Sequence, residues 1–308
     1  MADSGKPGAV DDSAFRCGTA VLVGRPNTGK STLLNAMLGC RLSIVGPKPQ
    51  TTRHRILGVL TRADGQILFL DTPGLHRGAP RAINRQLNRA ARGAIDEADV
   101  GIHVVEAGRW TGEDEAVWEA LETTGKPAVL VLNKIDKIKD KRKLLQIVAE
   151  ITSTRNYTDV YMVSATTRDG VAGLADAIVA ALPVAPAVFA ADELTDRSER
   201  FLASELIREQ LMLRLSQELP YATAVEVEAF RDGERGAEIE AAIWVERDGQ
   251  KAIVIGSKGA QLKAIGSAAR RAMETMFDRR VHLRLWVKVR QNWSDDEAAL
   301  RRFGYSDD

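Results

Sequence analysis

One stretch of the chain, residues 24–31, constrains its fold more than any other. Its sequence is Gly-Arg-Pro-Asn-Thr-Gly-Lys-Ser, the phosphate-binding loop pattern in which two glycines flank four residues and precede Lys and Ser. The apolar run 19–23 before it predicts a buried strand, and residues 31–38 after it predict a helix. Glycines allow backbone N–H groups to approach phosphate oxygens, and a helix N-terminus adds partial positive charge. The stretch therefore predicts a phosphate site, with Lys30 on the β- and γ-phosphates and the Ser31 hydroxyl on a magnesium ion.

A second motif supplies the carboxylate that such a site requires. Residues 66–70 predict a strand, paired as a hairpin with 56–61, and this strand ends in Asp-Thr-Pro-Gly at 71–74. In phosphate-loop proteins an Asp at this place organises the magnesium ion. We therefore expect Asp71 at the metal, and the N–H of Gly74 at the γ-phosphate, where it would sense hydrolysis.

The loop 41–55 between these motifs lacks periodicity and is polar and basic near its end. A Thr in this loop would complete the magnesium shell when a γ-phosphate is present. The candidates are Thr51 and Thr52, of which we favour Thr52. On the local sequence alone, an ordinary exposed loop is the better interpretation.

Base selection is predicted at the end of a later buried strand, 129–132, which runs into an Asn-Lys-Ile-Asp motif. Guanine presents two donors, N1–H and the N2 amino group, which one carboxylate accepts together, and adenine presents no such pair. Asp136 would therefore select guanine, while Asn133 braces the loop and the purine and the stem of Lys134 lies over the ring. A backbone N–H in residues 164–166, after one more strand, would donate to guanine O6.

All residues expected at the nucleotide lie in these motif loops. They are Gly24, Arg25, Pro26, Asn27, Thr28, Gly29, Lys30, Ser31, Thr32, Asp71, Thr72, Pro73, Gly74, Asn133, Lys134, Asp136, Ser164 and Ala165. Lys30, Thr52 and Gly74 are the expected catalytic residues, and Ser31, Thr52 and Asp71 the expected metal ligands.

The order of elements predicts an α/β fold for residues 16–183. Strands and helices alternate, with one hairpin near the start, which gives a mostly parallel sheet with helices on both faces. Ligands bind such sheets at the carboxyl ends of the strands, where all the motifs above fall. The predicted architecture is a phosphate-loop GTPase domain.

The second half predicts a smaller α+β domain. After a linker, 184–196, residues 197–292 give a helix over 197–217, two strands, a Gly-Ser-Lys-Gly loop, a helix and a last strand. This is the order of a type II KH domain, whose Gly-x-x-Gly loop clamps a single-stranded RNA backbone. Residues 251–290 hold ten basic residues against two acidic ones, which indicates an anionic partner. The expected RNA-binding residues are Lys251, Ile255, Gly256, Ser257, Lys258, Gly259 and Lys263.

Composition adds few constraints. The 308 residues carry a formal net charge of +1 and two cysteines, Cys17 and Cys40, which form no disulfide framework and suit a reducing cytosol. Residues 1–15 have no apolar core and predict a disordered segment rather than a signal peptide. The longest apolar stretch, 174–191, is interrupted by Asp and Pro and predicts no membrane span. We expect a cytoplasmic protein.

Over nearly its full length the chain resembles the Era family of bacterial ribosome-assembly GTPases. The matching stretches are residues 24–31, 50–55, 71–75, 133–136, 164–165, 195–201, 246–251 and 285–289. The resemblance implies action in small (30S) subunit assembly through the 3′ end of 16S ribosomal RNA. Leu75 stands where signalling GTPases place a water-orienting Gln; the family shares this replacement, and we expect slow intrinsic hydrolysis that awaits a partner. Related GTPases use an Asn at the position of Asn27 to bind potassium, and a loop-bracing amide is the equal alternative.

Two other function classes remain open on the sequence. One is a regulatory GTPase whose effector is a protein or a membrane, with the basic face on acidic lipids at the inner membrane. The other is an RNA-binding scaffold with a structural nucleotide. We favour a monomeric, GTP-hydrolysing assembly factor in which nucleotide state controls RNA docking, with the tail, 293–308, packed on the KH domain.

Overall fold

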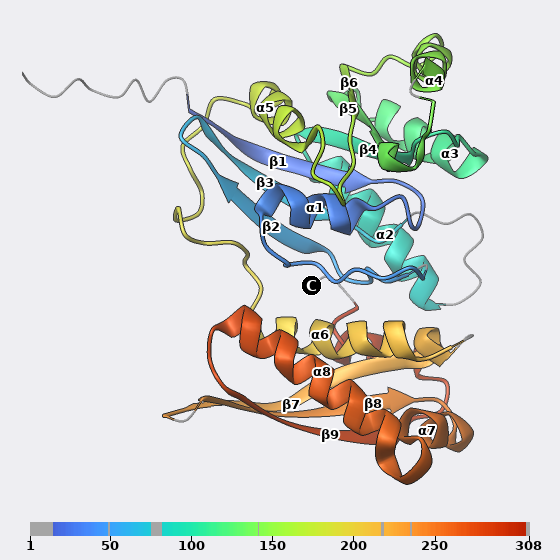
Figure 1. The fold of residues 1–308 in the computed structure, drawn as a ribbon, viewed down its shortest axis with the longest axis vertical. Coiled ribbons are helices and arrows are strands. Elements are labelled where there is room, and N and C mark those ends of the chain that lie inside the picture. The colour runs from blue at the N-terminus through green and yellow to red at the C-terminus, as the bar shows by residue number, and fades with distance from the viewer. Residues whose placement is uncertain are drawn as a thin grey trace, which may run out of the picture.

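The computed structural model describes residues 15–48, 50–74, 82–140, 142–216, 219–234 and 236–305. Of the segment expected to be disordered, residues 1–15, only Phe15 lies within these ranges. Figure 1 shows two layered units, one built on a large sheet and one on a small sheet. Helix α6 (Glu199–Arg214) belongs to the second unit and lies on the side that faces the first.

The first unit is a six-stranded sheet in the order β2-β3-β1-β4-β5-β6. Its strands are β1 (Arg16–Val23), β2 (Ile56–Thr61), β3 (Gly65–Asp71), β4 (Val100–Glu106), β5 (Ala128–Asn133) and β6 (Asp159–Met162). Only β2 runs antiparallel to its neighbour, as the predicted hairpin requires. The predicted mostly parallel sheet is therefore confirmed, and the carboxyl ends of its parallel strands share one edge.

Helices cover both faces of this sheet because its parallel strands carry apolar residues on both sides. They are α1 (Lys30–Leu38), α2 (Ala82–Glu97), α3 (Gly112–Glu122), α4 (Arg142–Thr152) and α5 (Val171–Ala181). Helices α1 and α5 pack on one face, and α2, α3 and α4 on the other. Helix α3 begins after Thr111, as predicted, in a capping box with Asp114. Within the described part of the chain, no helix has the length and apolar character needed to cross a membrane.

The second unit is a three-stranded sheet covered on one face by helices. In chain order its elements are α6, β7 (Thr223–Gly233), β8 (Gly236–Val245), α7 (Asp248–Ile255), α8 (Ala260–Phe277) and β9 (Val281–Val289). Strand β7 is antiparallel and β9 parallel to β8, which confirms the predicted α+β fold.

Two local predictions in this unit were wrong. The expected order had no helix between the second strand and the Gly-x-x-Gly loop, whereas α7 fills that place. Its eight residues include Gly249, a poor helix former, and Gln250 supports its start by accepting from the backbone N–H of Arg247. Helix α6 also ends at Arg214 rather than at residue 217. No glycine or proline marks this end in the sequence, so the prediction placed it too late.

The C-terminal tail lies between the two units. It contains the short helix α9 (Glu297–Arg302) and the buried side chains of Trp293 and Tyr305. These pack with Ala224 of β7, as expected, but also with Ile83 and Leu87 of α2. The tail therefore contacts the helix that follows the Asp-Thr-Pro-Gly turn, which its sequence did not predict.

Candidate nucleotide site and nucleic-acid interface

The phosphate loop connects β1 to α1, and its backbone has the conformation that its glycines permit. Gly29 precedes α1 with a φ of 97°, and Asn27 has a φ of 64°. The Lys30 ammonium donates to the carbonyl oxygens of Gly24 (2.9 Å) and Arg25 (3.1 Å). Burial lowers the pKa of Lys30 to about 8, although the Asp71 carboxylate opposes this shift. The loop thus holds a buried cation within a ring of backbone groups.

Three oxygen-bearing side chains converge beside this loop. The Ser31 hydroxyl donates to Asp71 Oδ2 at 2.7 Å and lies 2.8 Å from the hydroxyl of Thr52. The other carboxylate oxygen of Asp71, Oδ1, is buried and has no hydrogen-bond partner among the described residues. Burial raises the pKa of Asp71, although Ser31 and Ser43 both donate to it. Two hydroxyls and a carboxylate with an unused oxygen suit Mg²⁺, which prefers hard oxygen ligands and keeps sites for phosphate and water.

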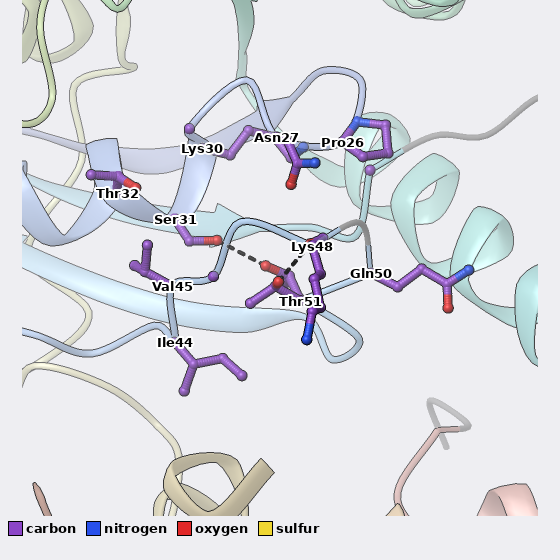
Figure 2. Close-up of a pocket in the computed structure, with 14 residues that line it drawn as sticks. Pro26, Asn27, Lys30, Ser31, Thr32, Ile44, Val45, Lys48, Gln50 and Thr51 are labelled. Carbon is purple, nitrogen blue, oxygen red and sulfur yellow. Dashed lines mark hydrogen bonds between the residues drawn. The ribbon is translucent and has the colours of Figure 1, made fainter. Parts of the chain in front are cut away.

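Both candidate threonines line the pocket beside the phosphate loop, where Figure 2 shows Thr51 close to Lys48. Thr52 reaches Ser31, whereas the Thr51 hydroxyl donates to the carbonyl oxygen of Lys48 at 2.7 Å. The geometry therefore favours Thr52 for the metal. Sequence reasoning did not identify Ser43, which is fully buried and donates to Asp71 at 2.7 Å.

The Asp-Thr-Pro-Gly turn lies directly against the phosphate loop. A Cβ placed on Gly74 would lie 2.8 Å from the backbone nitrogen of Pro26, closer than real Cβ contacts. Only glycine fits between the turn and the loop in this arrangement. Leu75, which follows it, lies outside the described residues.

The base-selecting loop is braced onto the phosphate loop by Asn133. Its amide nitrogen donates to the carbonyl oxygen of Thr28 at 2.9 Å, and its amide oxygen accepts from the N–H of Ala165 at 3.0 Å. Lys134 donates to the carbonyl oxygen of Asn27 at 2.6 Å. Asn133 therefore joins its own loop to the phosphate loop and to the loop at residues 164–166.

Asp136, which the sequence predicts to select the base, is exposed and accepts from the Ser164 hydroxyl at 2.7 Å. This bond fixes one carboxylate oxygen and leaves the side chain accessible. The structure thus brings together at one edge of the sheet all the described residues that the sequence assigned to the nucleotide and metal.

Two acidic residues at this site were not predicted. The side chain of Arg25 turns away from the loop to contact Glu106 and Asp114, at 3.2 and 3.3 Å. Glu106 ends β4, the same kind of strand end that carries the other polar motifs, and this position was the available signal. No local pattern marks Asp114 beyond its capping role in α3.

The Gly-x-x-Gly loop lies between α7 and α8, and three of its four residues have positive φ. These are Gly256 (70°), Lys258 (49°) and Gly259 (78°). A Cβ on Gly256 would lie 2.6 Å from the Cβ of Gln261, so this position requires glycine. Ser257, Lys258 and Lys263 are exposed, which leaves hydroxyl and ammonium groups free to meet a phosphate backbone.

A cavity of about 570 Å³ opens beside this loop. It extends to Arg214 and Leu215 at the end of α6 and to Ile253 of α7, whose side chain is 60% exposed. None of these three residues was predicted at the interface. Ile253 lies just before the loop in the chain, whereas the fold brings Arg214 and Leu215 next to it.

Comparison with known proteins agrees with this architecture. A family model described as a 50S ribosome-binding GTPase matches residues 19–134, and a KH domain model matches residues 218–294. The fold and the site therefore define a phosphate-loop GTPase joined to a KH domain.

Relatives identify the family more closely. GTPase Era of Stenotrophomonas maltophilia strain R551-3 is 52% identical over 295 residues, which cover 96% of this chain and 99% of the relative. GTPase Era of Xanthomonas oryzae pv. oryzae strain MAFF 311018 is 52% identical over 297 residues, with the same coverage. The chain belongs to the GTPase Era family.

Two solved structures match nearly the whole chain, each at 36% identity with a TM-score of 0.91. One is an Aquifex aeolicus Era variant bound to GDP and AlF4⁻, which covers 94% of this chain and 99% of its own. The other is Era in complex with MgGDPNP and nucleotides 1506–1542 of 16S ribosomal RNA, at 95% and 99%.

Proposed function

We propose that this chain hydrolyses GTP and binds the 3′ end of 16S ribosomal RNA during assembly of the small ribosomal subunit. The observation that carries the nucleotide half is the convergence of Ser31, Thr52 and Asp71 beside the phosphate loop. The RNA half rests on the Gly256–Gly259 loop, in which three of four residues have positive φ, and on the relative solved with a GTP analogue and 16S RNA. We take residues 16–183 and 197–292 as the two domains.

Different residues of the nucleotide site would bind the phosphates, the base and the metal ion. Lys30 exchanges its carbonyl partners for the β- and γ-phosphates, and the N–H of Gly74 bonds the γ-phosphate. Asp136 accepts both donors of guanine, and Asn133 holds the base loop to the phosphate loop. Ser31, Thr52 and Asp71 would hold Mg²⁺, which neutralises charge on the β- and γ-phosphates when bound.

Hydrolysis in the isolated protein is expected to be slow. Leu75 has no group that can orient a water molecule, and neither Lys30 nor Gly74 can accept its proton. A partner that positions the water would therefore accelerate turnover.

A potassium ion beside Asn27 is the finer part of this proposal. The Asn27 side chain is exposed while its backbone is held by Lys134, so its amide oxygen is free to ligate a cation at the phosphates. Equal hydrolysis rates in potassium and sodium would eliminate this site.

The segment that carries Thr52 also contacts the KH domain. Lys48 donates to the carbonyl oxygens of Met212 and Leu215 at the end of α6, and the N–H of Val45 donates to Glu209. Arg53, next to Thr52, donates across the interface to Thr223 at 2.8 Å. GTP would therefore fix this segment through Thr52, and loss of the γ-phosphate would release its hold on α6 and weaken RNA docking.

Competition binding with GTP, ATP and XTP tests the nucleotide half. We expect at least a hundredfold preference for GTP over ATP, and a shift of preference toward XTP in Asp136→Asn, which exchanges an acceptor for a donor. Equal affinity for ATP and GTP in the unaltered protein would contradict the proposal. GTP turnover in Lys30→Ala, compared with the unaltered protein, separates a GTPase from a scaffold with a structural nucleotide. A GTPase has a turnover that this substitution removes, whereas a scaffold has none to lose.

The RNA half is tested with an unpaired RNA carrying the 16S 3′-end sequence. Gly256→Asp with Gly259→Asp should remove most of the affinity, because carboxylates would face the phosphate backbone. The unaltered protein should bind this RNA more tightly with GDPNP than with GDP. Unchanged affinity in the glycine variant counts against the RNA-binding loop, and equal affinity with the two nucleotides counts against the coupled mechanism.

We further propose that the protein is a cytoplasmic monomer, with acidic membrane lipid as the alternative partner of the basic KH surface. Flotation with anionic vesicles in the presence and absence of the RNA distinguishes the two, because both would use residues 251–290. Sedimentation analysis gives the oligomeric state.

A further inference from the structure

Glu106 lies where the two halves of the nucleotide site meet. It is the last residue of β4, and the parallel register places it beside Asn133, the last residue of β5. One carboxylate oxygen, Oε2, lies 3.2 Å from the guanidinium of Arg25. The other, Oε1, lies 3.3 Å from the ammonium of Lys134. A single carboxylate therefore joins two cations that are 109 positions apart in the sequence.

Each cation is anchored in a different loop. Arg25 belongs to the phosphate loop, and its carbonyl oxygen accepts from both Lys30 and the Thr28 hydroxyl at 3.1 Å. Lys134 belongs to the base-selecting loop and also donates to the carbonyl oxygen of Asn27. Because both cations pair with the same carboxylate, a shift of one loop that moves Glu106 also disturbs its ion pair with the other loop.

The Arg25 side chain is fixed in this role by its surroundings. It is only 7% exposed, and its Nε donates to the fully buried Asp114 at 3.3 Å. Asp114 is itself held by the backbone N–H and hydroxyl of Thr111, at 2.9 and 2.8 Å. The guanidinium therefore points away from the phosphate position, and its partner carboxylates anchor the loop to the start of α3.

Burial alone would raise the pKa of Glu106, but the neighbouring Lys134 and Arg25 more than offset this and hold it below its usual value. The side chain therefore stays ionised at neutral pH. Because the pairs are about three-quarters buried or more, water screens them less than it screens surface ion pairs.

We propose that Glu106 is a positioning residue that ties the guanine-selecting loop to the phosphate loop, so that the two close on the nucleotide as one unit. The inference rests on the guanine-nucleotide site proposed above. Both carboxylate oxygens of Glu106 pair with these cations, so Glu106 would act through them rather than on the nucleotide directly. It holds Lys134 in place over the base and Arg25 in place behind the phosphates, and its loss would speed nucleotide release rather than slow the chemical step.

The test is the dissociation rate of fluorescent GDP from full-length Glu106→Gln, with KM and kcat for GTP measured on the same protein. We expect release to accelerate about tenfold and KM to rise by a similar factor, with kcat at saturation within twofold. Glu106→Asp, which keeps the charge at shorter reach, should restore part of the affinity. Glu119→Gln, on the exposed face of α3, is the matched control and should behave as the unaltered protein.

A double-mutant cycle separates this role from a general effect on stability. Glu106→Gln and Arg25→Met should accelerate release by less together than the product of their separate effects, because they break one network. Independent effects, or a release rate within twofold of the unaltered protein, overturn the inference. So does a fall in kcat with unchanged release. If Glu106→Gln does not fold, Glu106→Asp and Arg25→Met carry the same comparison. Equal affinity of the unaltered protein for ATP and GTP would instead refute the guanine site itself.

Discussion

The guanidinium of Arg53 donates a hydrogen bond of 2.8 Å to the carbonyl oxygen of Thr223, 170 residues further along the chain. Arg53 is 2% exposed and also reaches the carbonyl oxygens of Pro220 and Tyr221 and the hydroxyl of Tyr305. It follows Thr52 directly, so the residue next to a proposed metal ligand is inserted into the KH domain. A nucleotide-bound metal held by Thr52 would thereby be linked to the KH domain through the next residue in the chain.

Replacing Arg53 with Met should uncouple the two domains. Several buried oxygens would lose their donor, and each buried unsatisfied group costs about 1–3 kcal/mol. We expect urea denaturation to show a loss of that order, and the difference in RNA affinity between GDPNP and GDP to fall toward zero. Arg92→Met, on the exposed face of α2, is the control. A GDPNP effect of undiminished size would show that the signal takes another route.

Nucleotide binding should take up protons near pH 8. In the free protein, burial lowers the pKa of Lys30 to about 8, and contact with phosphate raises it again. Below about pH 7 the ammonium is already protonated, so uptake vanishes there. Calorimetry of GDP binding in two buffers of different ionisation enthalpy should therefore show proton uptake at pH 8 that shrinks as the pH falls toward 7. Buffer-independent enthalpies at pH 8 would contradict the assignment.

The same shift predicts how the stability of the nucleotide-free protein depends on pH. The folded pKa of Lys30 lies below the unfolded value of 10.5, so between about pH 8 and 10.5 the unfolded chain binds more protons. The contribution of this group to the free energy of unfolding therefore rises with pH across that window. Lys30→Met should remove this part of the pH dependence, whereas Lys143→Met, at an exposed position of α4, should leave it intact.

Ser43→Ala should weaken magnesium binding although Ser43 is not itself a proposed metal ligand. The buried Ser43 hydroxyl donates to Asp71 Oδ2, the oxygen that Ser31 also contacts. Loss of such an orienting bond typically costs ten- to a hundredfold in metal affinity. Titration of GDP binding with magnesium should show this loss, with little change in the magnesium-free affinity for GDP. An equal loss without magnesium would mean that Ser43 acts on the loop fold instead.

Gly74→Ala should block the GTP-bound arrangement of the turn selectively. The added Cβ would meet Pro26 at 2.8 Å, so the turn must move away from the phosphate loop and from the γ-phosphate. We expect GTP hydrolysis to fall at least tenfold while GDP affinity changes less than threefold. Equal losses for GDP and GTP would indicate damage to the phosphate loop instead.

Lys258→Ala should change the salt dependence of RNA binding more than its sequence preference. Lys258 is exposed in the Gly-x-x-Gly loop, where it would meet a phosphate. One lost phosphate contact lowers the salt slope by about one. Fluorescence anisotropy at several salt concentrations measures the slope, and an unchanged slope would remove Lys258 from the interface.

The sequence predicted those residues of the site that lie in a recognisable motif at the end of a strand. Asp71, Asn133 and Asp136 follow apolar strands, and a parallel sheet brings such strand ends together whatever the rest of the chain does. Thr52 needed a choice between neighbours, and the choice agrees with its contact to Ser31. These predictions required only spacing and strand order.

Other features depend on contacts that no local pattern reveals. Ser43 lies in a loop without periodicity, and the partners of Arg53 are about 170 residues away. Arg25 lies in the phosphate-loop motif and Glu106 at a strand end, but only the β4–β5 register and the path of the phosphate loop bring the two side chains together. Helix α7 was not predicted because it has only eight residues and contains Gly249. The packing of Trp293 and Tyr305 near α2 follows from domain arrangement, which composition does not specify.

The connection between the domains has little slack. Gln66 of β3 accepts from the N–H groups of Val188 and Phe189, and the Thr195 hydroxyl donates to the carbonyl oxygen of Leu57 in β2. Only residues 196–198 separate that anchor from α6, a span of about 10 Å at full extension. The linker therefore limits how far the KH domain can move from the GTPase domain. An RNA end caught on it would stay within a fixed radius of the nucleotide at every stage of the cycle.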